Sequence, residues 1–176
     1  ANTSASQQYY APDLIQKKAL AFIDEHKTRP FFLYLSYTLP HAALQLPEGD
    51  SLLEYYKRKF REQPQSIPAS WNGKGYQPQA YPHAAYAAMV SKLDQYVGQV
   101  VEKLKTLGLE KNTLIIFTSD NGPHREGGND PAYFNSSGGF RGIKRDLYEG
   151  GIRTPLIAYW PAIIKDGKVS HMIGAF

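Results

Sequence analysis

The sequence predicts an α/β fold in which a mostly parallel sheet is flanked by helices. Helix-like and strand-like segments alternate along the chain, in the order helix, strand, helix, strand. This order requires crossover connections, which join parallel strands of one sheet. Residues 31–37 (FFLYLSY) are apolar on both sides, as expected of a strand that helices cover on both faces.

The helices are predicted by apolar residues that recur every three or four positions. Residues 12–26 carry one such stripe. A longer stripe begins at Pro82 and continues to Gly108, a residue type that commonly ends helices. The region 42–81 is rich in Pro, Gln, Lys and aromatic residues and shows no sustained period, except for a candidate short helix at residues 52–60. We interpret this region as an excursion from the main fold and not as a second domain.

Polar residues follow two of the predicted strands. His41 comes shortly after the strand at 31–37, and Asp120 and Asn121 follow an apolar run at 114–117. We expect these two strands to be parallel neighbours. Ligands bind beyond the carboxyl ends of the strands in such sheets, so His41 and the Asp-Asn pair should lie at one edge and form a site.

A polar loop of about thirty residues follows Asp120 and Asn121, and a third strand at 156–160, of undetermined direction, comes after it. Loops of this length within a compact domain are usually functional or disordered. The Asp-Asn pair supplies two hard oxygen ligands, although Asp-Asn-Gly after a strand is also a common turn. Equally, His41 by itself fits a strand end, and Lys144 by itself fits a solvated surface lysine.

Composition narrows the choice of function. The chain has 176 residues, 42% of them hydrophobic, which suits one globular domain. The net charge of +4 is scattered, with no basic run longer than residues 57–59, so we expect no nucleic-acid partner. No apolar run has the length of a membrane span, and the first ten residues lack the pattern of a signal peptide. The absence of Cys excludes disulfides and a cysteine nucleophile within these residues.

Three segments carry a resemblance to a known family. They are FFLYLSYTLPHA, YAAMVSKLDQYVGQVVEKLKTLGLEKNTLIIFTSDNG and FRGIKRDLYEGGIRTPLIAYWP. In order and spacing they resemble the type I sulfatases, which are arylsulfatase-like enzymes of the alkaline phosphatase superfamily, with SDNG and GIKRDLYEGGIRTP as the specific motifs. The resemblance implies a partial alkaline-phosphatase-like sandwich. It also implies that residues 1–176 form a single partial domain, the middle to late portion of a sulfatase catalytic domain.

The resemblance implies roles for individual residues. Asp120 and Asn121 match the later pair of ligands to one Ca²⁺ ion, while the earlier aspartate ligands are expected outside this chain. Lys144 matches a lysine that contacts the sulfate and the ester oxygen, and His41 matches a histidine near the leaving group. Many relatives have His-x-Pro where this chain has His41-Ala42-Ala43. The family's formylglycine nucleophile arises in a Cys/Ser-x-Pro-x-Arg motif, which this sequence lacks, so it is expected upstream.

We therefore expect a sulfuric ester hydrolase, represented by a segment that is inactive alone. His124 and Arg125 begin a charged loop that suits a carbohydrate sulfate, and a sulfated small molecule or glycan is the expected partner. The remainder of the catalytic domain is the other expected partner, and export to the periplasm, the extracellular space or the lysosome is the expected localisation. Two alternatives stay open: a phosphodiesterase or phosphonate monoester hydrolase of the same superfamily, and a non-catalytic anion-binding module.

Overall fold

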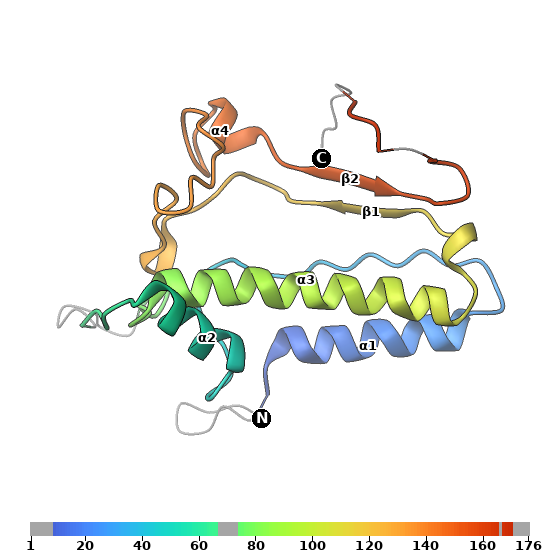
Figure 1. Ribbon diagram of the computed structural model, residues 1–176, viewed down its shortest axis with the longest axis horizontal. Coiled ribbons are helices and arrows are strands. Elements are labelled where there is room, and N and C mark those ends of the chain that lie inside the picture. Colours follow the sequence, from blue (N-terminus) through green and yellow to red (C-terminus); the bar gives the residue numbers. More distant parts are fainter. Residues whose placement is uncertain (1–8, 67–73, 166, 171–176) are drawn as a thin grey trace.

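The computed structural model describes residues 9–66, 74–165 and 167–170. Most of the N-terminal stretch that lacks signal-peptide features lies outside the described residues. Part of the 42–81 excursion also lies outside them. The elements, in chain order, are α1 (Ala11–His26), α2 (Ser51–Phe60), α3 (Pro82–Thr106), the 3-10 turn η1 (Glu110–Asn112), β1 (Ile115–Thr118), the 3-10 turn η2 (Glu126–Gly128), α4 (Glu149–Ile152) and β2 (Leu156–Tyr159) (Figure 1).

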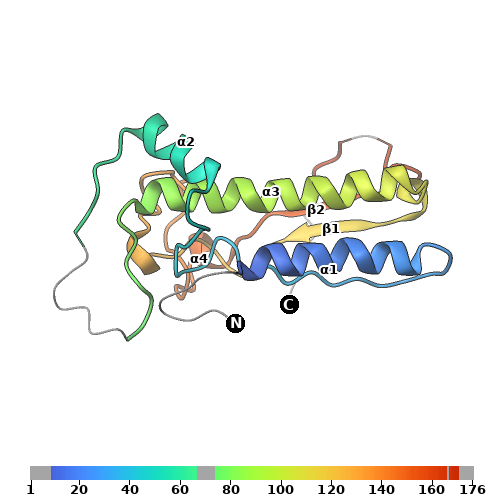
Figure 2. The ribbon, with the colours of Figure 1, turned by 90° about the horizontal axis from the view of Figure 1, so that it is seen from below.

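The elements form a helical layer and a strand layer. Helices α1 and α3 lie side by side, and β1 and β2 run on one side of them (Figures 1 and 2). The extended chain at residues 31–37 runs between α3 and β1 in Figure 1. This arrangement confirms a partial α/β fold, with helices on one side of the strands; cover on both faces of residues 31–37 is not found among the described residues. None of the helices in the described residues is long and apolar enough to cross a membrane.

All three longer helices are where their patterns predicted them. The first turn of α2 is capped by the Asp50 carboxylate, which accepts hydrogen bonds from the N–H groups of Leu52 and Leu53 at 3.0 and 3.2 Å. Helix α3 ends at Thr106, and Gly108 then adopts a φ of +68°. A left-handed residue at this position is a common way to end a helix, and glycine adopts it without steric cost.

The core joins α3 to the loop that follows residues 31–37. Leu39, Leu44, Ala85, Met89 and Tyr96 form its buried cluster. Burial of these apolar side chains is the main stabilising contribution to such a core. Leu39 and Leu44, which precede and follow His41 in the sequence, therefore hold the loop that carries His41 against α3.

The strand predicted at residues 31–37 and its parallel pairing with β1 are not found. The segment is extended, but the only backbone hydrogen bond that it donates to a described residue runs from Tyr37 to Leu35, at 3.1 Å. Instead β1 pairs with β2 in antiparallel register, with Ile115 opposite Tyr159. The apolar pattern correctly predicted an extended conformation, but a strand also needs a neighbouring backbone, and no described residue supplies one for this segment.

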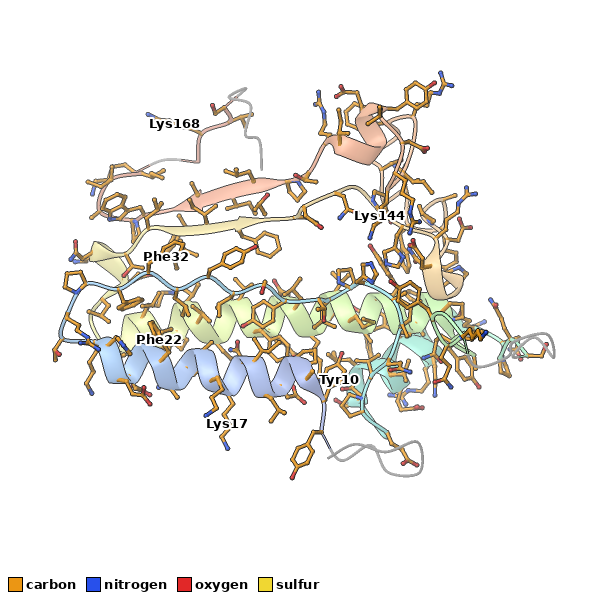
Figure 3. The ribbon with its side chains drawn as sticks, turned by 180° about the vertical axis from the view of Figure 1, so that it is seen from behind. Tyr10, Lys17, Phe22, Phe32, Lys144 and Lys168 are labelled. Atoms are coloured by element: carbon orange, nitrogen blue, oxygen red, sulfur yellow. The ribbon has the colours of Figure 1, made fainter. Side chains whose placement is uncertain are left out.

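The strand layer exposes much apolar surface. On the extended segment, Phe32 is 87% exposed and Tyr34 is 78% exposed, and Figure 3 shows Phe32 where this segment runs between the helices and β1. Ile116 of β1 and Ile157 of β2 are also exposed. They lie on opposite faces of the strand pair, because Ile116 is opposite Ala158 and Ile157 is opposite Phe117. Large exposed apolar side chains of this kind are typical of a contact with further polypeptide, and we expect such polypeptide to cover both faces.

Replacement of both Phe32 and Tyr34 with serine tests whether further polypeptide covers these side chains in the intact protein. In residues 1–176 alone these side chains bury little surface, so the change should reduce binding of a hydrophobic dye and leave stability nearly unchanged. In the intact protein it should lower the free energy of unfolding by about 3 kcal/mol or more, as for loss of buried aromatic rings. Urea melts and dye fluorescence on both proteins measure the difference. A monomeric, sharply melting wild-type chain 1–176 that binds no dye would contradict the expectation.

Candidate active site

The structure brings together the two residues with predicted catalytic roles. Lys144 Nζ lies 2.9 Å from His41 Nε2, although the residues are 103 positions apart. The other ring nitrogen, His41 Nδ1, lies 2.7 Å from the carbonyl oxygen of Ala42. A carbonyl only accepts hydrogen bonds, so this contact assigns the proton to Nδ1. The lone pair of Nε2 then accepts a hydrogen bond from the Lys144 ammonium group.

Backbone contacts tie the loop of Lys144 to the turn after β1. The Lys144 N–H donates to the Pro123 carbonyl at 2.8 Å, and the Gly122 N–H donates to the Gly151 carbonyl at 2.8 Å. A side chain at Gly122 is excluded, because its Cβ would lie 2.0 Å from the Gly150 carbonyl oxygen. Glycine at this position therefore allows the SDNG turn to pack directly against the backbone of the YEGG segment.

Asp120 and Asn121 lie in the turn after β1, as predicted, with Ser119 between them and the strand. The Asp120 side chain is exposed, and the Asn121 amide donates to its Oδ1. Among the described residues, no group of three or more His, Cys, Asp or Glu side chains gathers in a way that suits a metal ion. Calcium takes six to eight oxygen ligands. A carboxylate and a carboxamide side by side therefore fit part of a calcium shell.

His124 and Arg125, predicted to bind substrate, occupy different environments. His124 is only 6% exposed. Its Nε2 lies 3.1 Å from the Pro40 carbonyl oxygen, and its ring stacks on that of His41 with centroids 5.4 Å apart. The Arg125 side chain is exposed. His124 thus lies against the ring of His41, whereas Arg125 is exposed to solvent. A role of these two residues in binding substrate stays a prediction.

Glu126 is a buried charge in the same cluster. One carboxylate oxygen lies 3.0 Å from His124 Nδ1, and the other forms an ion pair with Arg145. Burial acts to raise the pKa of this carboxyl group, but its own backbone N–H, Arg145 and His124 outweigh it and lower the pKa below its ordinary value. The group is therefore ionised at neutral pH. The sequence showed Glu126 only as one charge of a polar loop.

Tyr76 is a site residue that sequence reasoning missed. Its ring meets His41 edge-on, with centroids 5.4 Å apart, and the side chain is 47% exposed. Two side-chain hydrogen bonds hold its segment to the His41 loop, from Gln79 to the Leu44 carbonyl at 2.6 Å and from Gln45 to Gln77 at 3.1 Å. No periodic pattern in the excursion could have indicated this contact.

Comparison with known proteins adds to this geometry. The sequence model of the family described as Sulfatase matches residues 2–175. The chain is 32% identical over 168 residues to an uncharacterized sulfatase, YdeN, of Escherichia coli strain K12, covering 94% of this chain. It is 34% identical over 170 residues to N-acetylgalactosamine-6-sulfatase of Mus musculus, covering 92% of this chain.

A solved structure has a similar fold. The crystal structure of Ps i-CgsB in complex with k-i-k-neocarrahexaose superposes on 88% of this chain with a TM-score of 0.62 and 31% sequence identity. The chain covers 29% of that structure. It spans about a quarter of the curated relatives, 26% of both the bacterial and the mouse protein.

Proposed function

This chain belongs to the sulfatase family, and we propose that it carries part of the active site of an enzyme that hydrolyses sulfate esters of carbohydrates. The observation that carries the proposal is the 2.9 Å contact between Lys144 and His41, next to the turn that holds Asp120 and Asn121. A cation, an imidazole and two hard oxygen ligands at one end of the strand layer suit the handling of a negatively charged, tetrahedral sulfate ester.

Lys144 and His41 have complementary tasks in this proposal. The Lys144 ammonium stabilises negative charge that develops on the sulfate ester oxygens as the bond to the alcohol breaks. His41 Nε2 accepts a hydrogen bond from that ammonium, which orients Lys144 and makes the proton on Nζ available to the leaving oxygen. The carbonyl of Ala42 keeps Nδ1 protonated. The pair thus carries one positive charge, which stabilises the developing negative charge until Nζ gives a proton to the leaving oxygen and becomes a neutral amine.

Asp120 and Asn121 would hold a divalent cation, which we propose is Ca²⁺. Such an ion supplies a fixed positive charge for the sulfate oxygens. The remaining ligands, and the formylglycine nucleophile of the family, are assigned in this proposal to sequence outside residues 1–176. The exposed apolar side chains of the strand layer support this division, because the remainder of a catalytic domain would cover them.

Two observations support a carbohydrate substrate. The mouse relative is named for a sulfated amino sugar, and the structural neighbour holds a neocarrahexaose. In this chain the half-exposed Tyr76 beside His41 and the exposed Arg125 next to His124 in sequence present an aromatic ring and a cation to solvent. Sugars commonly meet such mixed apolar and polar surfaces in binding sites. We propose a sulfated glycan as the substrate, and the periplasm, the extracellular space or the lysosome as the location of the enzyme.

Replacement of His41 tests the activity. In the intact protein, His41→Ala should lower kcat for release of sulfate from a sugar sulfate about a hundredfold, because the Lys144 ammonium that serves as the general acid loses the imidazole that orients it. His26→Ala, at the C-terminal end of α1, is the matched control and should leave kcat unchanged. Ion chromatography measures the sulfate. Hydrolysis of a phosphodiester without any sulfate release by the wild type would instead support a phosphoryl-transfer enzyme of the same superfamily.

A further inference from the structure

We propose that Glu126 is a positioning residue that holds Lys144 and His41 within hydrogen-bond distance of each other. The expected effect on catalysis rests on the proposed function. The expected effect on the contact between Lys144 and His41 rests on the geometry alone. Glu126 reaches the catalytic pair through two separate contacts, one by way of His124 and one by way of Arg145.

The first contact runs from Glu126 to His41. Glu126 approaches His124 Nδ1 twice, with a carboxylate oxygen at 3.0 Å and with its backbone N–H at 3.1 Å. The opposite nitrogen of His124 bonds the carbonyl of Pro40, the residue before His41. The two imidazole rings also stack, with an interplanar angle of 30°. Glu126 thus orients the ring against which His41 packs.

The second contact runs from Glu126 to Lys144. Arg145 directly follows Lys144 and has a φ of +80°, a region that residues other than glycine seldom adopt. Its guanidinium forms an ion pair with Glu126. An ion pair at this residue favours the backbone conformation that turns Lys144 toward His41. Glu126 therefore sets the direction of both catalytic side chains, through its backbone N–H on the His124 side and through its carboxylate on the Arg145 side.

Burial distinguishes this carboxylate from a surface partner. The Glu126 side chain is 15% exposed, and neither oxygen has a hydrogen bond of standard geometry within the described residues. Its negative charge is therefore what attracts the Arg145 guanidinium. The pair of Glu149 and Arg153 in α4 joins the same residue types at 2.8 Å, but their side chains are 54% and 62% exposed. That pair is the matched control, because both arginines are exposed and the two pairs differ mainly in the burial of the carboxylate, and an ion pair with an exposed carboxylate contributes little.

The test uses the intact protein with Glu126→Gln, which keeps the size of the side chain and removes its charge. We expect kcat on a sugar sulfate to fall about tenfold with KM within about twofold, because a small misplacement of catalytic groups lowers turnover more than binding. Glu149→Gln should match the wild type. In a Lys144→Ala background the Glu126→Gln effect should nearly vanish, because a residue that acts through Lys144 has nothing left to position. A full tenfold loss in that background would overturn the proposal.

A second measurement does not need turnover. In a crystal structure of Glu126→Gln, we expect Lys144 Nζ and His41 Nε2 to separate beyond hydrogen-bond distance, to more than about 3.5 Å. Arg145→Gln changes a side chain that is 73% exposed, so its folding should be retained, and it should separate the same two atoms. Retention of the 2.9 Å contact in both variants would overturn the proposal, whereas a wild type that releases no sulfate would overturn only the proposed function.

Discussion

Replacement of Lys144 with alanine in the intact protein is expected to lower kcat on a sugar sulfate by a factor of about 100 or more. This corresponds to about 2.7 kcal/mol of lost transition-state stabilisation. The physical reason is the loss of the ammonium that lies 2.9 Å from His41 Nε2. The melting temperature should change little, because Lys144 is at a partly exposed position. Lys17→Ala, on the exposed face of α1 (Figure 3), is the matched control.

The size of the loss should depend on the leaving group. An activated ester such as p-nitrophenyl sulfate needs less help at the bridging oxygen, so Lys144→Ala should reduce its turnover less than that of a sugar sulfate. Parallel kinetics on the two substrates measure this ratio. An equal loss on both would leave Lys144 a role in binding sulfate and remove its role at the leaving group. Wild-type turnover of the sugar sulfate would end the assignment.

Asp120→Ala is expected to abolish calcium binding by the intact protein and to reduce sulfate release to near background. A carboxylate is the only charged ligand that this chain offers at the turn after β1, and its loss leaves the Asn121 amide alone. Isothermal titration calorimetry measures the affinity. Asp94→Ala, at an exposed position on α3, is the control. Calcium affinity that is unchanged by Asp120→Ala would contradict the ligand role.

The same titration on residues 1–176 alone adds a comparison. With two of the six to eight oxygen ligands that calcium takes, the isolated chain should bind the ion weakly or not at all. Tight binding by the isolated chain would mean that this chain supplies more of the shell than Asp120 and Asn121.

The sequence by itself determined those features that depend on neighbouring residues. The apolar stripes of α1 and α3, the Gly108 stop and the turn after β1 are local patterns, and the structure confirms them. The SDNG and GIKRDLYEGGIRTP segments were also sufficient for the family, which the match over residues 2–175 confirms. Short-range sterics and periodicity specify helices, caps and turns, so one sequence is enough to read them.

Only the tertiary structure decided which distant groups meet. The contact of His41 with Lys144, the edge of Tyr76 against His41, and the ion pair of Glu126 with Arg145 join residues that are far apart in the sequence. Strand pairing belongs to the same class, since residues 31–37 had a strand pattern and yet β1 pairs antiparallel with β2. Pairing and side-chain contacts depend on which backbone lies alongside, and that is set by packing of the whole fold and not by the residues of either segment alone.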